Sequence, residues 1–466
     1  KASGLVNMSA GSCICVALPG RQEDGTEEWI SAKPRHACDG LRVNRLDRPY
    51  LRDAKGKLKP ASWTDAFEAV AERLKGVDGK KVAAVTGDLC DVESMMALKD
   101  LMTGLGSPHM ECRQDGAKFD PYQPCGYGFN TTIAGVEEAD AILLIGTNPR
   151  WEAAMLNARI HKNWRANNTK IGVIGPRADL NYEYAHLGTG SDALEDLLAG
   201  KHSFAAILEK AEKPMLILGM GAVRRDDGLA VHAMARAVAE KFGMVRDDWN
   251  GFNLLQLAAA RMGALSIGFV PDQARGGLDM DGIIAASKTG DIEILYALGA
   301  DELPYDRLSK KTFVIYQGHH GDAGAARADV IFPGAAYTEK PGLYVNLEGR
   351  VQTARKAAFP PGDAREDWTI LRALSSHMGY PLPYDNPAEL RARLIQENEM
   401  FDHIDQIPHA AWKTFAADAG DVKKLPFRLP VANFYKTCPV SRVSVTMQEC
   451  TDAFVDKTME KKRANA

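Results

Sequence analysis

Two neighbouring stretches decide the fold of this chain. Residues 328–334 read Ala-Asp-Val-Ile-Phe-Pro-Gly, and residues 339–350 read Glu-Lys-Pro-Gly-Leu-Tyr-Val-Asn-Leu-Glu-Gly-Arg. The first has the pattern of a short buried strand that a Pro-Gly pair ends. The second is typical of a polar loop, which carries Asn346 and Arg350. We therefore expect a buried strand here that leads into a polar loop.

The same kind of strand recurs along the chain, in alternation with helical patterns. Residues 92–105 show helical spacing of apolar side chains, and Gly106 follows as a C-terminal stop. Short, continuously apolar strands between helices predict parallel sheets that are covered on both faces. Because there are at least seven such strands, two doubly wound units fit better than one. The predicted strands are 82–85, 141–145, 171–174, 215–218, 292–298, 312–316 and 329–332.

The length of the chain predicts more than one domain, because 466 residues exceed what a single core accommodates. We expect an α/β protein with a small β module over 1–46. A first α/β domain is predicted to be discontinuous, over 47–111 and 280–380, and a second covers 112–279. Residues 381–466 are expected to form a tail that is helical and then extended, with proline punctuation.

Composition narrows the classes of function. Net charge is −4, from 57 basic and 61 acidic side chains, and no basic stripe stands out, so nucleic acid is not an expected partner. The apolar runs are too short to span a bilayer. Eight cysteines lack the density of a secreted disulfide scaffold, which favours a reducing compartment. Because the chain begins at Lys1, we expect a processed product or a fragment.

Two strand-end loops are candidates for ligand binding. Residues 146–149, Gly-Thr-Asn-Pro, directly follow one predicted strand and precede a helix. Such loops can hold a nucleotide against helix N-terminal N–H groups, or they can be plain turns in which Asn-Pro starts the helix. The pair His319-His320 follows another strand. Adjacent histidines point apart unless the loop is sharply bent, and this pair lacks metal-ligand spacing, so we interpret the segment as a loop that lines a cleft.

No catalytic residue is assigned. The sequence holds no Ser-His-Asp order, paired-carboxylate signature or P-loop, and Asp115 and Glu339 have no partner identifiable from sequence. The cysteines are scattered and form no CxxC, whereas a cubane cluster needs four thiolates, three of them usually close together. We therefore expect thiols without metal.

Several segments together resemble the large iron–sulfur (75 kDa-type) subunit of respiratory complex I, in its C-terminal molybdopterin-oxidoreductase-like part. The resemblance covers nearly the whole chain and leans towards the mitochondrial branch. It implies α/β domains of the formate dehydrogenase and DMSO reductase type. The family's ferredoxin-like part, which holds 2Fe–2S and 4Fe–4S clusters, is not within this sequence. The segments that carry the resemblance are 28–33, 130–137, 146–150, 157–160, 316–322, 333–340 and 364–368.

The resemblance also implies that a cluster site has been lost. In molybdopterin enzymes the small β module carries a CxxCxxxC group and a fourth cysteine. Those positions fall here on residues without a thiolate, so the module is expected to lack its 4Fe–4S cluster. The four positions are Leu5, Met8, Ser12 and Ser31.

Two further departures concern the molybdenum cofactor. Cys112 lies near the position of the metal ligand of the active enzymes, but Arg113 follows it in place of their His-Gly type context. The loop that corresponds to the second nucleotide-binding loop of the active enzymes carries Asp301 and Glu302. Two carboxylates beside the pyrophosphate of the cofactor are unfavourable, because like charges repel. We expect no cofactor or metal in this chain and treat four residues as remnants of a pocket: Gly146, Asn148, Asn346 and Arg350.

The resemblance leads to two functional hypotheses. The first is a structural, non-catalytic part of the complex I peripheral arm, on the matrix side of the mitochondrial inner membrane or the cytoplasmic side of a bacterial inner membrane. Its expected partners are the cluster-bearing ferredoxin-like part and the NADH-oxidising flavoprotein subunits. The alternative is a stand-alone molybdopterin-dependent oxidoreductase of the formate dehydrogenase type.

Overall fold

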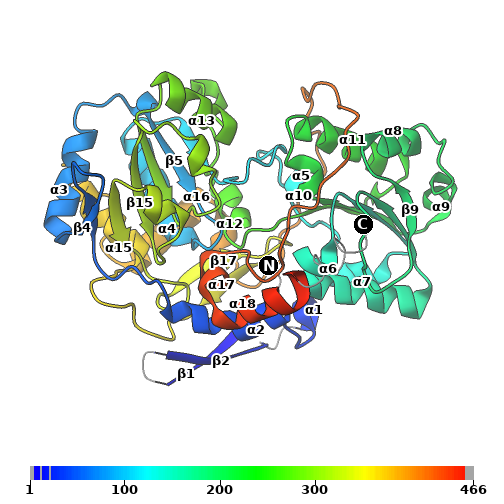
Figure 1. The fold of residues 1–466 in the computed structure, drawn as a ribbon. Coiled ribbons are helices and arrows are strands. Elements are labelled where there is room, and N and C mark those ends of the chain that lie inside the picture. The colour runs from blue at the N-terminus through cyan, green and yellow to red at the C-terminus, as the bar shows by residue number, and fades with distance from the viewer. Residues whose placement is uncertain (1–4, 11–12, 20–22, 457–466) are drawn as a thin grey trace.

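Two parallel sheets, each covered by helices, make up most of the molecule (Figure 1). The computed structural model describes residues 5–10, 13–19 and 23–456. Every strand predicted from the sequence is present, with ends that differ by at most two residues. The predicted fold class, two doubly wound parallel-sheet units with a small β module and an irregular tail, is confirmed.

The first sheet has seven strands in the order β4-β3-β16-β15-β14-β5-β6. The five strands from β16 to β6 run parallel, and β3 and β4 add an antiparallel edge. The order changes direction between β5 and β14, which makes this the topological switch point of the sheet. The strands are β3 (Tyr50–Arg52), β4 (Leu58–Pro60), β5 (Val82–Thr86), β6 (His109–Glu111), β14 (Ile294–Leu298), β15 (Phe313–Gly318) and β16 (Val330–Pro333).

The second sheet has five parallel strands in the order β13-β10-β7-β8-β9. Its switch point lies between β7 and β10, since β8 and β9 extend the sheet on one side and β10 and β13 on the other. The strands are β7 (Ala141–Ile145), β8 (Lys170–Ile174), β9 (Ala185–Gly188), β10 (Pro214–Gly219) and β13 (Phe252–Leu255). A separate small ladder pairs β11 (Val245–Arg246) with β12 (Trp249–Asn250).

Strand side chains alternate between two apolar layers, which explains the continuous apolar strands. In β5, Ala84 belongs to a large apolar cluster, here called the inner layer, that contains residues of both sheets, whereas Val85 belongs to an outer layer with Ile283 of α13. In β7, Leu143 and Leu144 divide in the same way. The inner layer is one continuous cluster, so the two sheets share a core.

Helices lie on both faces of each sheet (Figure 1). On the first sheet, α3, α4 and α15 belong to the inner layer and α13 and α14 to the outer one; on the second, α8, α9 and α11 belong to the inner layer and α7 to the outer one. Their bounds are α3 (Trp63–Leu74), α4 (Val92–Gly104), α13 (Met280–Thr289), α14 (Ala323–Arg327), α15 (Asp367–His377), α7 (Ala154–Asn167), α8 (Ser191–Leu198), α9 (Ala205–Lys210) and α11 (Gly228–Lys241). Short helices complete the connections: α5 (Pro124–Tyr127), α6 (Pro149–Glu152), α10 (Met220–Val223) and α12 (Arg261–Ser266).

The segment predicted as a polar loop is instead a β-hairpin, which corrects that prediction. β17 (Gly342–Val345) pairs antiparallel with β18 (Val351–Ala354), and only the five residues between them form the turn. The side chain of Asn346 accepts the N–H groups of Glu348 and Arg350. Leu343 is fully buried, so the strand forms because it covers the inner core.

The N-terminal module and the last described helices of the tail lie side by side below the sheets (Figure 1). The N-terminal module is a hairpin of β1 (Leu5–Ala10) and β2 (Cys13–Pro19), followed by α1 (Glu23–Thr26) and α2 (Ala32–His36). After α16 (Pro387–Glu397), the tail runs without a long helix along the second sheet's domain and ends in α17 (Pro439–Val443) and α18 (Val445–Thr451) beside α2 (Figure 1). The domain boundaries stay a prediction. Among the described residues, no helix combines the length and the hydrophobicity needed to cross a membrane.

Candidate functional site

At the switch point of each sheet, a loop that follows a strand contains a buried carboxyl group. Gly146 follows β7 with φ of 59°, and Gly299 follows β14 with φ of 57°, a left-handed conformation that glycine adopts without strain. The N–H groups of both glycines continue the sheet, donating to Ile174 O (2.8 Å) and Gln317 O (2.7 Å). We call residues 146–152 the second-sheet loop and residues 299–302 the first-sheet loop.

The second-sheet loop is organised around Glu152, the last residue of α6. Its carboxylate accepts the N–H of Asn148 at 2.6 Å and the hydroxyl of Thr147 at 3.0 Å. The loop therefore uses its own polar groups to hold an acid instead of leaving them for an external anion. Burial raises the pKa of Glu152 to about 7.

The first-sheet loop is organised around Asp301. Its carboxyl accepts hydrogen bonds from the hydroxyl of Tyr316 (2.8 Å) and the N–H of Gly324 (3.2 Å), and burial raises its pKa to about 7. Arg442 of α17 covers this loop from the tail, with 2.7 Å contacts to Glu302 and to Asp322. The carboxylates that the sequence placed beside a cofactor are thus engaged with the chain's own groups.

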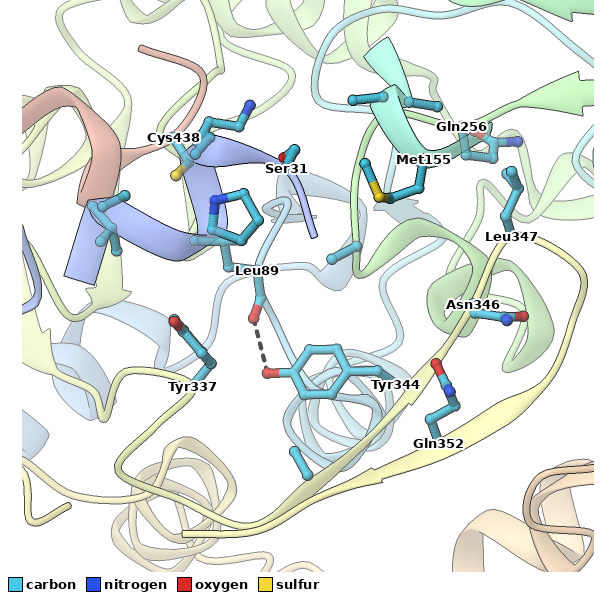
Figure 2. Close-up of a pocket in the computed structure, with 18 of the residues that line it drawn as sticks. Ser31, Leu89, Met155, Gln256, Tyr337, Tyr344, Asn346, Leu347, Gln352 and Cys438 are labelled. Atoms are coloured by element: carbon cyan, nitrogen blue, oxygen red, sulfur yellow. Dashed lines mark hydrogen bonds between the residues drawn. The ribbon is translucent and has the colours of Figure 1, made fainter. Parts of the chain in front are cut away.

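A cavity of about 930 Å³ lies between the second sheet, the β17–β18 hairpin, α2 and the tail (Figure 2). We call it the central cavity. Its wall is mostly apolar, with Tyr337 and Tyr344 on one side and Met155 and Leu347 on the other. The hydroxyl of Tyr344 donates to Leu89 O at 3.2 Å (Figure 2). Further lining residues are Ser31, Lys33, Trp151, Glu152, Gln256, Asn346, Gln352, Arg355, Lys356, Phe434 and Cys438.

The four residues predicted to belong to a pocket differ in their position relative to the central cavity. Asn346 lines the cavity, although its side-chain oxygen holds the hairpin turn. Gly146 and Asn148 lie in the second-sheet loop. Glu152, which accepts the N–H of Asn148, lines the cavity. Arg350 is engaged elsewhere, in contacts with Glu348 (3.1 Å) and the carbonyl of residue 405 (2.8 Å).

At the first sheet's switch point, the space is occupied by an ion network. Lys340 lies between Asp91, at 2.5 Å, and Asp367, and all three side chains are buried. Gln317 also donates to Asp367, at 2.9 Å. The two carboxylates raise the pKa of Lys340 well above its ordinary value, so the ammonium stays charged. The pocket that remains here is only about 20 Å³.

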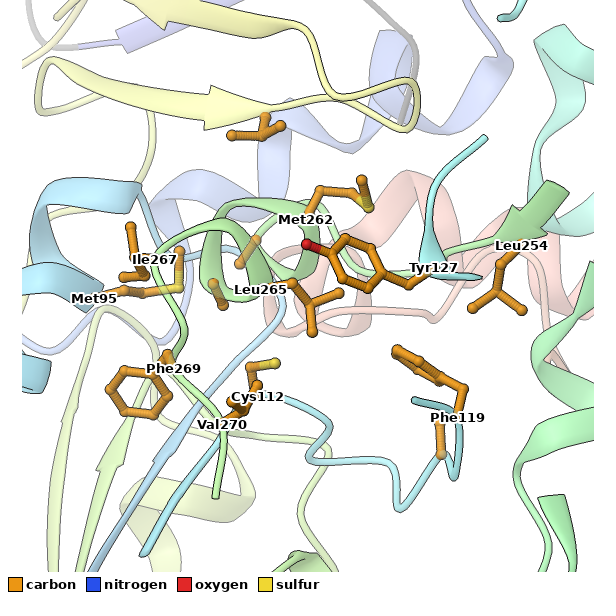
Figure 3. Close-up of a cluster of buried hydrophobic side chains, with 14 of the residues drawn as sticks. Met95, Cys112, Phe119, Tyr127, Leu254, Met262, Leu265, Ile267, Phe269 and Val270 are labelled. Carbon is orange, nitrogen blue, oxygen red and sulfur yellow. The ribbon is translucent and has the colours of Figure 1, made fainter. Parts of the chain in front are cut away.

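Cys112 lies in an apolar cluster (Figure 3). Met95, Phe119, Phe269 and Val270 belong to the same cluster, and the cysteine is 3% exposed. Burial raises the pKa of Cys112 to about 12, and a metal would require the thiolate. This environment favours the interpretation of Cys112 as a core thiol.

Three of the four positions implied for a cluster lie among the described residues. Leu5 and Met8 are on β1, and Ser12 falls outside the described residues. Ser31 precedes α2 and lines the central cavity. In the part of the chain that the structure describes, no three His, Cys, Asp or Glu side chains are grouped as a metal site would require.

Side-chain contacts supply three details that the sequence left open. Asp115 has a partner, Arg261, at 2.9 Å, and Glu339 has one, Arg45, at 2.5 Å. The adjacent histidines do not point apart: Nδ1 of His319 and Nδ1 of His320 lie 2.5 Å apart. These groups stabilise the fold around the first sheet.

Comparison with known proteins places the chain in a family. A sequence model of the molybdopterin oxidoreductase family matches residues 45–377, which contain both sheets. The chain belongs to the molybdopterin oxidoreductase family. A second model, which describes the C-terminal part of the NADH-ubiquinone oxidoreductase G subunit, matches residues 407–450, within the tail.

Relatives of this molybdopterin oxidoreductase family member include complex I subunits. The chain is 42% identical over 445 residues to NADH dehydrogenase [ubiquinone] iron-sulfur protein 1, mitochondrial, of Solanum tuberosum, and covers 59% of that protein. It is also 42% identical to the NADH-quinone oxidoreductase G subunit of Rickettsia felis, covering 64% of it. These matches span 95% and 96% of the chain and confirm the predicted resemblance. They do not separate the mitochondrial from the bacterial branch.

Solved structures show the same fold at low sequence identity. Acetylene hydratase from Pelobacter acetylenicus aligns with a TM-score of 0.62 and 14% identity, over 87% of this chain and 73% of that one. The formyltransferase/hydrolase complex of Methylorubrum extorquens aligns with a TM-score of 0.50 and 17% identity, over 71% of this chain and 98% of that one. Likeness at this level supports the fold only.

Two buried polar residues of the cavity wall, Glu152 and Gln256, were not predicted from the sequence. Glu152 had a detectable signal, because an acid four residues after Asn148 can bond back to a helix start. Gln256 had no detectable signal in the sequence. It follows the buried strand β13 and lines the cavity because of the position of that strand in the sheet.

Proposed function

We propose that this chain is a structural, non-catalytic part of the peripheral arm of respiratory complex I, the NADH:ubiquinone oxidoreductase. The observation that carries the proposal is the similarity to complex I subunits along 95% of the chain. The match of residues 407–450 to the C-terminal part of the G subunit adds support from the tail. A stand-alone oxidoreductase would have no reason to retain that tail.

The absence of redox chemistry in this chain is supported by how poorly its residues fit the family's cofactor. A pterin cofactor carries phosphate groups, and the strand ends that would face them present the carboxyl groups of Glu152 and Asp301. Cys112 is buried as a thiol. Ser31 offers a hydroxyl where a cluster ligand would be a thiolate.

The proposed partners are the ferredoxin-like part that holds the 2Fe–2S and 4Fe–4S clusters and the NADH-oxidising flavoprotein subunits. Electron transfer would take place in those partners, while this chain holds them in position. The proposed location is the matrix side of the mitochondrial inner membrane, or the cytoplasmic side of a bacterial inner membrane.

The test of assembly is co-migration. The tagged chain, expressed in its own cells, should co-migrate on a native gel with a large membrane complex that oxidises NADH. Recovery of the chain only as a free protein, with the NADH-oxidising band lacking it, would contradict complex I membership.

The test of the non-catalytic role is elemental analysis of the purified chain. We expect neither iron nor molybdenum in stoichiometric amounts, and no cluster signal by electron paramagnetic resonance. One molybdenum or tungsten per chain would support the alternative, a stand-alone oxidoreductase of the formate dehydrogenase type. Stoichiometric iron would contradict the non-catalytic role without affecting complex membership.

A further inference from the structure

Two acceptor groups of the central cavity come from the same edge of the second sheet. Glu152 ends α6, which follows β7, and Gln256 directly follows β13. Both strands are parallel members of one sheet, so their carboxyl ends lie on the same side. Both residues line the central cavity, and each is at most 6% exposed. This part of the wall therefore presents oxygen acceptors from a buried position.

Gln256 has an acceptor that the described residues leave unused. Its Nε2 donates to Tyr127 O at 3.2 Å, which sets the orientation of the amide. Its Oε1 is inaccessible to bulk solvent and has no hydrogen-bond partner among the described residues. A buried acceptor left unpaired is unfavourable. A ligand that brings an N–H donor into the cavity would pair with this oxygen after a shift of the Gln256 side chain, because the oxygen has less than 1 Å² of accessible surface in its present position.

Glu152 is an acid without an ion-pair partner. No lysine, arginine or histidine of the described residues lies within ion-pair distance of its carboxylate, and Arg224 acts on it only through space. Its two hydrogen bonds come from neutral groups of its own loop. In a poorly solvated cavity, a cation at contact distance would be attracted to this carboxylate. Glu152 therefore favours a positively charged occupant.

The basic residues of the cavity do not reverse this preference. Lys33 donates to Thr437 at 2.6 Å and lies over the ring of Phe434, 4.8 Å from its centroid. Arg355 and Lys356 are exposed, so their charges are screened by water. The buried carboxyl and the unused amide oxygen thus determine which group is favoured inside.

The rest of the wall suits an aromatic or apolar body. Tyr337, Tyr344 and Trp151 provide ring surfaces, and a cation near such rings gains further attraction. The volume of about 930 Å³ is large enough for a drug-sized molecule. We propose that the central cavity binds a small organic cation, an amidine, guanidine or amine on an apolar body, whose N–H groups pair with Gln256 Oε1 and the Glu152 carboxylate.

The test compares three probes of nearly equal shape and different charge: benzamidine, benzamide and benzoate. Titration calorimetry with the whole chain at pH 8 should show benzamidine binding about tenfold more tightly than benzamide. Benzoate should bind more weakly than either. Equal or tighter binding of benzoate, or no binding of benzamidine at millimolar concentration, would overturn the proposal.

Variants identify the residues. Glu152→Gln should remove the preference for benzamidine over benzamide, and Gln256→Leu should weaken binding of both probes. The matched control is Asp301→Asn, which changes the buried acid of the first-sheet loop, outside the central cavity, and should leave the three affinities unchanged. Retention of the full charge preference in Glu152→Gln would contradict the proposal. The binding test uses the isolated chain and is therefore independent of complex assembly.

Discussion

The first-sheet and second-sheet loops begin alike and end in different surroundings. Each follows a strand at the switch point, starts with a left-handed glycine and holds a carboxyl group whose pKa is raised to about 7. The first-sheet loop is covered by Arg442 and lies next to the Lys340 network, which leaves about 20 Å³. The second faces about 930 Å³. What packs over a loop, more than its own sequence, decides whether it can take a ligand.

The largest effect on stability is expected from Lys340→Met, next to the first-sheet loop. This change leaves Asp91 and Asp367 buried without their cation, which should reduce the free energy of unfolding by about 3–5 kcal/mol. Denaturant unfolding at pH 7 measures the loss. Lys356→Met, at an exposed position on the cavity rim, is the control and should change stability by less than about 0.5 kcal/mol. A loss of similar size in both variants would remove the distinction between the two loops.

Glu152→Gln in the second-sheet loop is expected to have a smaller effect, of opposite sign, on the free energy of unfolding. The pKa of Glu152 is raised to about 7 in the folded chain from an ordinary value of 4.5, so ionisation is harder in the folded state. Its contribution to stability therefore falls as the pH rises from about 4.5 to above 7, by up to about 3 kcal/mol. The variant should lack this decline.

The measurement is the free energy of unfolding of both proteins at pH 5 and pH 8. The difference between the two pH values isolates the titration of Glu152 from the hydrogen bond lost on substitution. If the variant and the parent protein lose the same stability between these pH values, burial does not raise the pKa of Glu152. The contrast with Asp91 and Asp367, which are paired with Lys340, then fails.

The smallest effect is expected from Arg442→Gln, which uncovers the first-sheet loop. Arg442 is half-buried and contacts both Glu302 and Asp322, so its loss should cost about 1–2 kcal/mol and loosen the tail. Limited proteolysis should cut the variant faster near residue 440. Arg442→Lys should be intermediate, because a lysine ammonium lacks the planar fork of N–H donors with which the guanidinium holds Glu302 and Asp322 at 2.7 Å. Equal cleavage rates in all three proteins would show that Arg442 does not hold the tail.

The sequence predicted the sheets well and the site less well. Apolar runs such as 141–145 predict buried strands, because only a strand covered on both faces is apolar at every position. The hairpin around Asn346 was missed, since its polar turn dominates the local pattern and its strands are only four residues long. The partners of Asp115 and Glu339 were missed because Arg261 and Arg45 are distant in sequence.

The sequence by itself determined the family and the two doubly wound sheets. These follow from local residue types and spacing, which the fold does not change. Only the tertiary structure decided that Arg442 closes one switch point while Glu152 and Gln256 face a cavity at the other. Burial and long-range pairing set the energy of a charge, and neither is present in the order of residues along the chain.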